Sequence, residues 1–262
     1  MILLSAILTA VGAVTPQPDH IQTVEALALT AIPIVQEEPA PASQSNVWQG
    51  KATVSMSATD GNTNEKGAYA DLNMDKKFEN GDNWNVGLFW NFRQSGGAIT
   101  QRNTHLETKY DVAMDEKTYY YGLATVDSKL ENSLDLGWTV GAGIGHTVVE
   151  KEGYTVSVEA GLSQVDESYT DSADDDSYLS GRVGYDVKYE YSEKLAFSNN
   201  AFLLSSLDDA DDQNGRMVTN ATYKMTSSML AQAGWIWDWD NTPVSGKGKN
   251  DNLYTLSLGW TF

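Results

Sequence analysis

The sequence contains no cysteine, which excludes disulfide bonds. Basic residues are scarce: 17 Lys and Arg stand against 36 Asp and Glu. The resulting net charge of −19 argues against nucleic-acid binding, which needs clustered Lys and Arg. No apolar run reaches the roughly 18 residues that a transmembrane helix requires. A mean hydropathy of −0.39 fits a soluble β protein, but it also fits a transmembrane barrel, in which only every second residue faces lipid.

Residues 2–14 form an apolar segment with the length of the hydrophobic region of a signal peptide, too short to cross a bilayer. Small residues at positions 26 and 28 (Ala26-Leu27-Ala28) give a cleavage pattern, so we expect residues 1–28 to be a signal peptide. The segment lacks the usual early Lys or Arg, and the alternative is a buried helix. Residues 36–46 are polar and proline-rich, which predicts a disordered linker, assigned to residues 29–46, before a folded domain at 47–262.

From residue 47 onward, apolar and polar residues alternate with a period of two, which is typical of β-strands. Such segments run for about 9–13 residues, the length needed to cross a membrane at a tilt, whereas strands of soluble sandwiches have about 5–6 residues. In the segment 177–191, the alternation predicts that Val183 and Tyr185 contact lipid. It predicts equally that Arg182 and Asp186 point into a barrel lumen.

Twelve segments of this kind follow one another along the chain. They span residues 47–59, 66–78, 83–94, 103–114, 118–128, 134–148, 153–167, 177–191, 194–206, 216–226, 228–239 and 252–262. Short turns such as 79–82 and 149–152 alternate with longer polar loops such as 95–103 and 166–176, as in outer-membrane barrels. The sequence therefore predicts an all-β fold, a transmembrane antiparallel up-and-down β-barrel of about 12 strands, with both chain ends on the periplasmic side.

The final strand carries apolar side chains at alternate positions and ends on an aromatic residue. Leu258, Trp260 and Phe262 resemble the assembly signal of outer-membrane proteins, so we expect them to act in membrane insertion. Aromatic residues near the short turns predict a girdle at the periplasmic interface. They are Trp84, Tyr110, Tyr119, Tyr120, Tyr154, Tyr189, Tyr191 and Tyr223.

Several short motifs resemble a known family. They are Trp48-x-Gly50 followed by Asp60-Gly61-Asn62-Thr63, the central Gly141-Ala142-Gly143-Ile144-Gly145, and Asp240-Asn241-x-Pro243 with Gly246-Lys247 and Asp251 before Phe262. In this order they resemble the salt-induced outer-membrane proteins, a family defined by domain of unknown function 481, over about residues 47–262. The resemblance implies an outer-membrane barrel without an assigned activity or catalytic residues, and a role in envelope or osmotic stress.

Charged residues on the polar faces of the strands predict a charge network in the lumen. Its candidates are Arg93, His105, Glu107, Asp127, Arg182 and Asp186. Residues of the fourth and fifth strands pair when their numbers sum to about 232, which places His105 opposite Asp127 and Glu107 opposite Thr125. His105 beside Asp127 also suits the base of a lipid hydrolase, with Ser95 or Ser128 as nucleophile. However, the sequence has no GxSxG motif and indicates no oxyanion hole.

Two of the predicted loops are strongly acidic. Their carboxylates are weak candidates for a cation site on the outer surface; they are Asp171, Asp174, Asp175, Asp176, Asp208, Asp209, Asp211 and Asp212. Neither run has the spacing of an EF-hand, so no dedicated metal site is predicted. The alternatives are solvated loops that repel one another and contact with lipopolysaccharide through bridging divalent ions.

These observations favour a non-enzymatic protein of the bacterial outer membrane that needs no cofactor. Its expected partners are outer-membrane lipid, lipopolysaccharide and, during biogenesis, the barrel-assembly machinery. Two other functions stay open. A small channel for ions or small solutes would use the mixed-charge lumen, since about 12 strands lie between a filled barrel of about 8 and an open pore of about 16. A lipid hydrolase would use His105.

Overall fold

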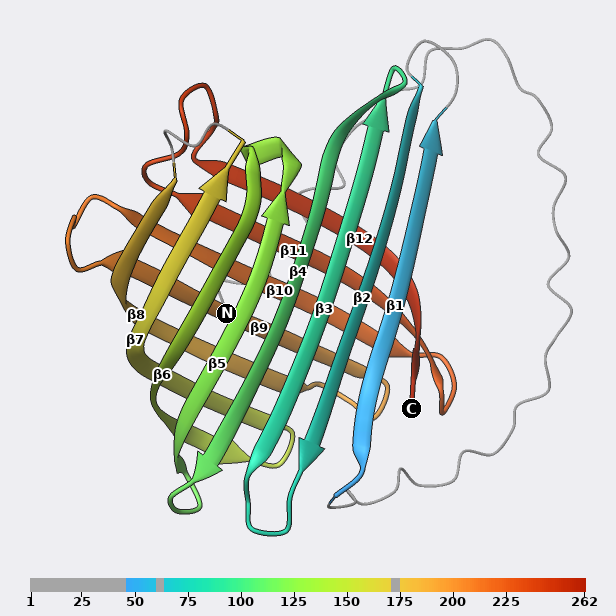
Figure 1. Cartoon of the computed structure of the whole chain (residues 1–262). Helices are drawn as coiled ribbons and strands as arrows, with labels where there is room; N and C mark the ends of the chain where they lie inside the picture. Colours follow the sequence, from blue (N-terminus) through green and yellow to red (C-terminus); the bar gives the residue numbers. More distant parts are fainter. Residues whose placement is uncertain (1–45, 60–63, 171–174) are drawn as a thin grey trace, which may run out of the picture. The chain divides into compact units, whose positions relative to one another are not determined.

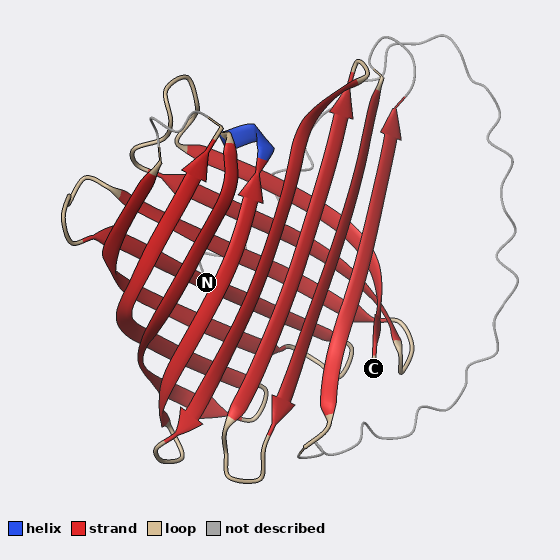
Figure 2. Ribbon diagram, viewed as in Figure 1, coloured by secondary structure: helices blue, strands red, loops and turns tan. Residues whose placement is uncertain are grey.

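The computed structural model describes residues 46–59, 64–170 and 175–262, so the predicted signal peptide and residues 29–45 of the predicted linker lie outside the described residues. The described chain forms β-strands and one short 3-10 helix (Figures 1 and 2). The elements are β1 Trp48–Thr59, β2 Glu65–Lys77, β3 Asn83–Ser95, β4 Ala98–Ala113, β5 Thr118–Lys129, η1 Leu130–Asn132, β6 Leu134–Lys151, β7 Tyr154–Tyr169, β8 Asp176–Glu190, β9 Leu195–Ser206, β10 Gln213–Lys224, β11 Met229–Asp240 and β12 Asn250–Thr261.

Each strand pairs antiparallel with its neighbours in sequence, and β1 pairs with β12 to close the barrel. The prediction of an all-β, up-and-down barrel of about 12 strands is therefore confirmed. Closure suits a membrane because hydrocarbon offers no partner to a free backbone N–H or C=O group. The 3-10 helix of the described chain is too short to cross a membrane.

The connections fall into two sets. The end of the barrel that carries residues 207–212 and 241–249 is called the long-loop end here, and the opposite end, with turns such as 78–82, the short-turn end. One predicted loop, residues 95–103, is wrong: β3 runs to Ser95, β4 begins at Ala98, and only two glycines connect them. Gly96 and Gly97 have φ of 59° and 88°, as a two-residue hairpin requires. The polar and glycine-rich composition of residues 95–103 is typical of a loop, although most of these residues belong to β4.

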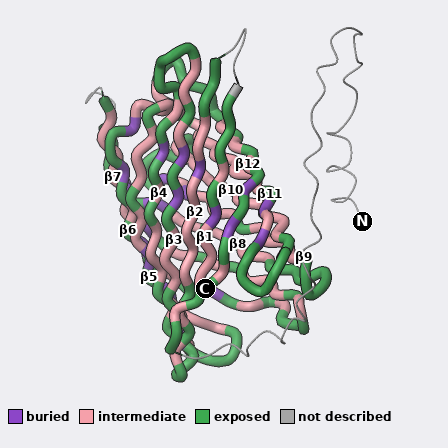
Figure 3. Tube along the Cα trace, turned by 90° about the vertical axis from the view of Figure 1, so that its right-hand side faces the viewer, coloured by how far each residue is buried: buried purple, intermediate pink, exposed green. Residues whose placement is uncertain are grey.

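The outer surface of the barrel is apolar along the middle of its strands. Val183 on β8 is 54% exposed, and Tyr185 is exposed beside it, whereas Arg182 forms an ion pair inside the barrel. The predicted facing of β8 is confirmed. Figure 3 shows buried residues as short stretches between more exposed ones, as expected where alternate side chains face outward. A continuous apolar belt of this kind needs a lipid environment.

Aromatic side chains gather near the short-turn end, where the sequence predicts a girdle. The rings of Tyr154 and Tyr189 on the outer face lie 5.9 Å apart, and Tyr120 is exposed there as well. For Tyr119 the prediction is wrong, because its hydroxyl donates to Glu159 inside the barrel at 3.0 Å. Neighbouring residues of a strand point to opposite faces, so only one of the two adjacent tyrosines can face lipid.

Glycines of the central motif make room for tyrosine rings in the lumen. A Cβ atom added to Gly145 would collide with the ring of Tyr119, and one added to Gly143 would collide with the hydroxyl of Tyr121. The same hydroxyl approaches Gly161 on β7. Both rings therefore lie against the inner wall of β6 and β7 and fill part of the lumen.

The seam between β1 and β12 has the shortest pairing in the barrel. Only residues 51–54 and 258–261 are paired, extended at the short-turn end by two hydrogen bonds between Gly50 and Phe262, of 2.8 and 3.0 Å. Towards the long-loop end, the strands separate, and β1 pairs only with β2 and β12 only with β11 (Figure 1). The most exposed large apolar side chains of the described chain flank this unpaired half: Met56 at 86%, Leu256 at 77% and Tyr254 at 72%.

Candidate functional site

A cavity of about 540 Å³, called the vestibule here, opens at the long-loop end of the barrel. Residues of η1 and of β4 to β12 form its walls, and residues 242–245 and 247–249 contribute to its rim. One wall is apolar and consists of Val165, Tyr178, Leu204 and Phe202. The volume is that of a typical small-molecule pocket.

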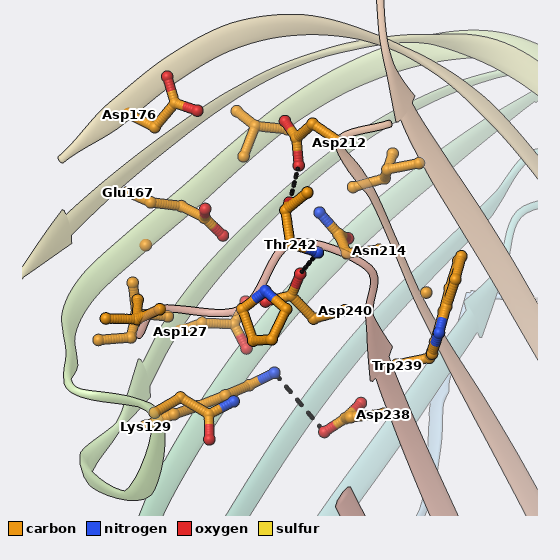
Figure 4. Close-up of a pocket in the computed structure, with 18 of the residues that line it drawn as sticks. Asp127, Lys129, Glu167, Asp176, Asp212, Asn214, Asp238, Trp239, Asp240 and Thr242 are labelled. Atoms are coloured by element: carbon orange, nitrogen blue, oxygen red, sulfur yellow. Dashed lines mark hydrogen bonds and ion pairs between the residues drawn. The ribbon is translucent and has the colours of Figure 1, made fainter. Parts of the chain in front are cut away.

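The polar lining of the vestibule is acidic: nine carboxylates face four Lys and Arg side chains, which leaves a net negative charge. Figure 4 shows Glu167, Asp176, Asp212 and Asp240 gathered around this space. Within the described chain, no ion pair involves any of these four. Such an uncompensated field attracts cations and repels anions.

The carboxyl group of Asp212, in the loop between β9 and β10, shows the effect of these negative charges on a pKa. Burial raises the pKa of its carboxyl group, and repulsion from Asp176 and Asp240 adds to the rise. The hydroxyl of Thr242 opposes it by donating to Asp212 at 3.1 Å. A cation in the vestibule would lower this pKa again, because it stabilises the charged form.

The floor of the vestibule is a layer of ion pairs that crosses the lumen. Arg216 Nε and Nη2 donate to Oδ1 and Oδ2 of Asp238 at 2.6 and 2.9 Å, and Lys129 Nζ lies 3.5 Å from the same carboxylate. Lys129 ends β5 and Asp238 lies on β11, so their pair spans the closed barrel from one wall to the opposite one. Arg216 on β10 also lies 5.7 Å from the ring of Phe89 on β3. We call Lys129, Arg216 and Asp238 the bridging layer.

A second cluster, called the lower cluster, lies nearer the short-turn end. Glu159 Oε1 lies 2.6 Å from Lys109 Nζ, and Glu159 Oε2 accepts from Arg182 at 2.9 Å. Both cations also lie over the ring of Tyr121, at 5.2 and 5.5 Å from its centroid. These contacts join β4, β5, β7 and β8 and narrow the lumen on that side.

Two of the predicted register relations are confirmed. His105 is opposite Asp127, with Nδ1 and Oδ1 2.8 Å apart, and Glu107 is opposite Thr125. A hairpin with a short turn fixes such pairs, because one paired position determines all the others. His105 and Asp127 also line the vestibule, beside the bridging layer.

The other members of the predicted charge network lie apart from this pair. Arg182 belongs to the lower cluster, and Asp186 meets only Lys188, at 3.8 Å and partly in solvent. Arg93 is exposed, takes part in no ion pair of the described chain, and lies at the bulge before the β3–β4 turn. The ion pairs that cross the lumen are instead made by Arg216 and Asp238 together with Lys129. Sequence reasoning missed Arg216 and Asp238, although each lies on the inward-facing set of its strand.

Of the acidic loop residues, Asp176, Asp208, Asp209 and Asp212 line the vestibule. Asp171 and Asp174 lie outside the described residues. Asp212 is half-buried in the vestibule wall, and the remaining members are exposed: Asp175, Asp176, Asp208, Asp209 and Asp211. Within residues 46–59, 64–170 and 175–262, no three His, Asp or Glu side chains come close enough to hold a metal ion. The cation site on these loops therefore stays a prediction, because two of its eight candidate residues lie outside the described ranges.

A hydrolase would need a nucleophile beside His105. Asp127 is the hydrogen-bond partner that the described chain gives to His105. Ser128 follows Asp127 on the same strand, and its side chain therefore points to the opposite face. Ser95 ends β3, six residues beyond Phe89, which is the residue of β3 that pairs with His105. The site thus offers charge and volume but no nucleophile in contact with the histidine.

Comparison with known proteins gives a family match and distant structural neighbours. A family model described as a protein of unknown function, DUF481, matches residues 52–262. No curated protein matches the chain.

Among solved structures, the chain is similar to the NanC porin, with 13% identity and a TM-score of 0.47 over 81% of this chain and 97% of the porin. It is similar to the translocator domain of the autotransporter NalP from Neisseria meningitidis, with 13% identity and a TM-score of 0.49 over 84% and 89% of the two chains. For the KdgM porin, in a complex with disordered oligogalacturonate, identity is 7% and the TM-score 0.44 over 82% and 98%.

Proposed function

Because the chain belongs to the DUF481 family of proteins of unknown function, its role has to be inferred from its own site, and we propose that it is a non-enzymatic outer-membrane barrel that conducts small cations. The observation that carries this proposal is the acidic vestibule above the bridging layer. An acidic mouth raises the local concentration of cations. The ion pairs across the lumen keep the path narrow and exclude larger solutes.

The outer membrane is the location that best fits the fold. Bacterial outer-membrane barrels have an even number of antiparallel strands, an apolar outer band and aromatic girdles, and this chain has all three. In this proposal the long-loop end faces outward, so its acidic loops contact lipopolysaccharide through divalent ions. The barrel-assembly machinery inserts the chain. A role in osmotic or salt stress would follow from cation passage, and growth of a deletion strain at high salt tests that role.

The proposed orientation predicts which connections are accessible on intact cells. An epitope tag in the loop at 208–212 should be labelled from outside, whereas a tag in the turn at 152–153 should be labelled only after the outer membrane is permeabilised. The ground is that long loops of such barrels face the exterior and short turns the periplasm. Labelling of the 152–153 tag on intact cells, without labelling at 208–212, would reverse the orientation.

Planar-bilayer recordings test conduction. We expect the wild-type barrel to show small discrete conductance steps, and the double substitution Arg216→Ser with Asp238→Ser to enlarge them several-fold. The double variant removes both charges of the hydrogen-bonded pair at once, so neither Arg216 nor Asp238 is left without the other, and Lys129 keeps its charge at the wall of β5. It also opens the space that these side chains fill across the barrel.

The matched control is the double substitution Asp186→Ser with Lys188→Ser. It also removes one ion pair, but this pair lies near the short-turn end and does not cross the lumen. Its conductance should equal that of the wild type. A wild-type barrel that is silent in the bilayer, together with a silent Arg216→Ser/Asp238→Ser variant, would contradict the channel function.

A further inference from the structure

A second, much smaller cavity lies in the lumen between β3, β4, η1, β11 and β12. Its volume is about 20 Å³, room for one water molecule or one ion. Four polar atoms of its lining residues are buried and have no hydrogen-bond partner. They are Nδ2 of Asn91, Oε1 of Gln101, Oδ1 of Asn103 and Oε2 of Glu131.

The burial of these groups makes their lack of partners costly. Asn91 is only 4% exposed and Asn103 only 8%. A buried polar atom without a partner loses its hydration and gains nothing in return, and the cost in free energy is greater for a charged group. Native proteins therefore satisfy nearly all such atoms with protein groups, ordered water or ions. Four of them around one small cavity indicate that something binds there.

Charge distinguishes an ion from a water molecule. Three carboxylates line the cavity, those of Glu131, Asp238 and Asp251. Asp238 is already neutralised by Arg216 and Lys129, but no ion pair of the described chain involves Glu131 or Asp251. A water molecule would leave the two negative charges of Glu131 and Asp251 uncompensated, whereas a bound cation neutralises them.

We propose that this cavity binds one Ca²⁺ ion. The two unpaired carboxylates offer four oxygens and the amides of Gln101, Asn103 and Asn91 three more, within the roughly six to eight oxygens that Ca²⁺ accepts. Asn91 presents oxygen in place of nitrogen when its amide turns by a half rotation, which occupies the same space. Mg²⁺ suits the site less well, because it keeps several water molecules and the cavity has no room for them.

The ion would have a structural role at the weakest part of the barrel. Asp251 lies on the half of β12 that has no pairing with β1, and Glu131 lies on η1, beyond the end of β5. Gln101 and Asn103 lie on β4, on the other side of the lumen. One ion held by all three elements would fix the long-loop half of β12, whether or not the lumen conducts.

Thermal unfolding of the folded full chain in detergent, with EGTA or with CaCl₂, tests the site. We expect Ca²⁺ to raise the melting temperature of the wild type by several degrees and Mg²⁺ at the same concentration to raise it much less. A ligand that binds only the folded state stabilises it by mass action. Glu131→Gln should abolish the Ca²⁺ shift, and the matched control Glu116→Gln, in an exposed turn, should keep it.

Gln101→Met provides a second variant that retains the charge of the site and most of its volume. Calorimetric titration should show that Gln101→Met binds Ca²⁺ at least tenfold more weakly than the wild type. This variant tests the site even if Glu131→Gln does not fold. Absence of any Ca²⁺ shift in the wild type would show that the cavity holds an ordered water only. Equal shifts with Mg²⁺, or an unchanged shift in folded Glu131→Gln, would place the bound ions on the acidic loops and overturn the proposal.

Discussion

Removing Phe262 from this chain should sharply lower the yield of folded, heat-modifiable barrel in the membrane and raise the amount of aggregated or degraded protein. The seam between β1 and β12 depends on four paired residues of each strand, and the two hydrogen bonds between Gly50 and Phe262 extend it at the short-turn end. A backbone group left without a partner in hydrocarbon costs on the order of several kcal/mol. Loss of the last pair should therefore prevent stable closure.

Side-chain packing at the same point gives an independent test. The ring of Phe262 covers Gly50, where any Cβ atom would collide with it, so Gly50→Val should also lower the folded yield. The matched control is Tyr191→Ala, which removes an exposed aromatic ring from the β8–β9 turn, away from the seam. Equal membrane yields for wild type, the Phe262 deletion and Gly50→Val would count directly against the role of this contact in assembly.

Val183→Arg should destabilise the folded barrel by about 2–4 kcal/mol, because it places a charge on the lipid-facing side of β8 near its middle. Leu179→Arg lies four residues nearer the long-loop end of the same strand and on the same face. It should cost clearly less, because the penalty for a charged side chain falls towards the membrane interface. Urea unfolding in lipid vesicles measures both free energies.

Arg182, the inward-facing neighbour of Val183, should instead lose stability when its charged side chain is replaced by an apolar one. Arg182→Val leaves Glu159 with Lys109 as its ion-pair partner, and we expect a loss of stability from the disrupted lower cluster. Arg182→Lys should recover part of it. A barrel in which Val183→Arg is as stable as the wild type while Arg182→Val fails to fold would mean that the facing of β8 is inverted.

The alternation of side chains made the fold predictable from the sequence. A period of two over segments of membrane-spanning length fixes which face of each strand meets lipid, as Val183 and Arg182 illustrate. A short turn between two such segments fixes their register, which is why the pairing of His105 with Asp127 could be derived. The polar or glycine-rich composition of the strand ends made some strands look shorter than they are, as at Gly96 and Gly97 and at the start of β10.

The site was less predictable, because it depends on contacts across the lumen. Lys129 and Asp238 meet because the strand tilt and stagger bring their levels together on opposite walls, and a linear sequence does not specify this level. The small cavity could not be predicted either. In the sequence Gln101 and Asn103 are ordinary polar positions of a strand, and only the closed barrel places Glu131 beside them. The unpaired half of the seam likewise emerges only when the sheet is closed.

The reversal potential in a KCl gradient across a planar bilayer tests the proposed function most directly. The acidic vestibule predicts a potential with the sign for K⁺ passage. The double substitution Asp212→Asn with Asp240→Asn, at two carboxylates without ion pairs, should move it towards zero without changing the yield of folded barrel. A potential with the sign for Cl⁻ passage, or one that the double substitution leaves unchanged, would contradict the proposal that this barrel conducts cations.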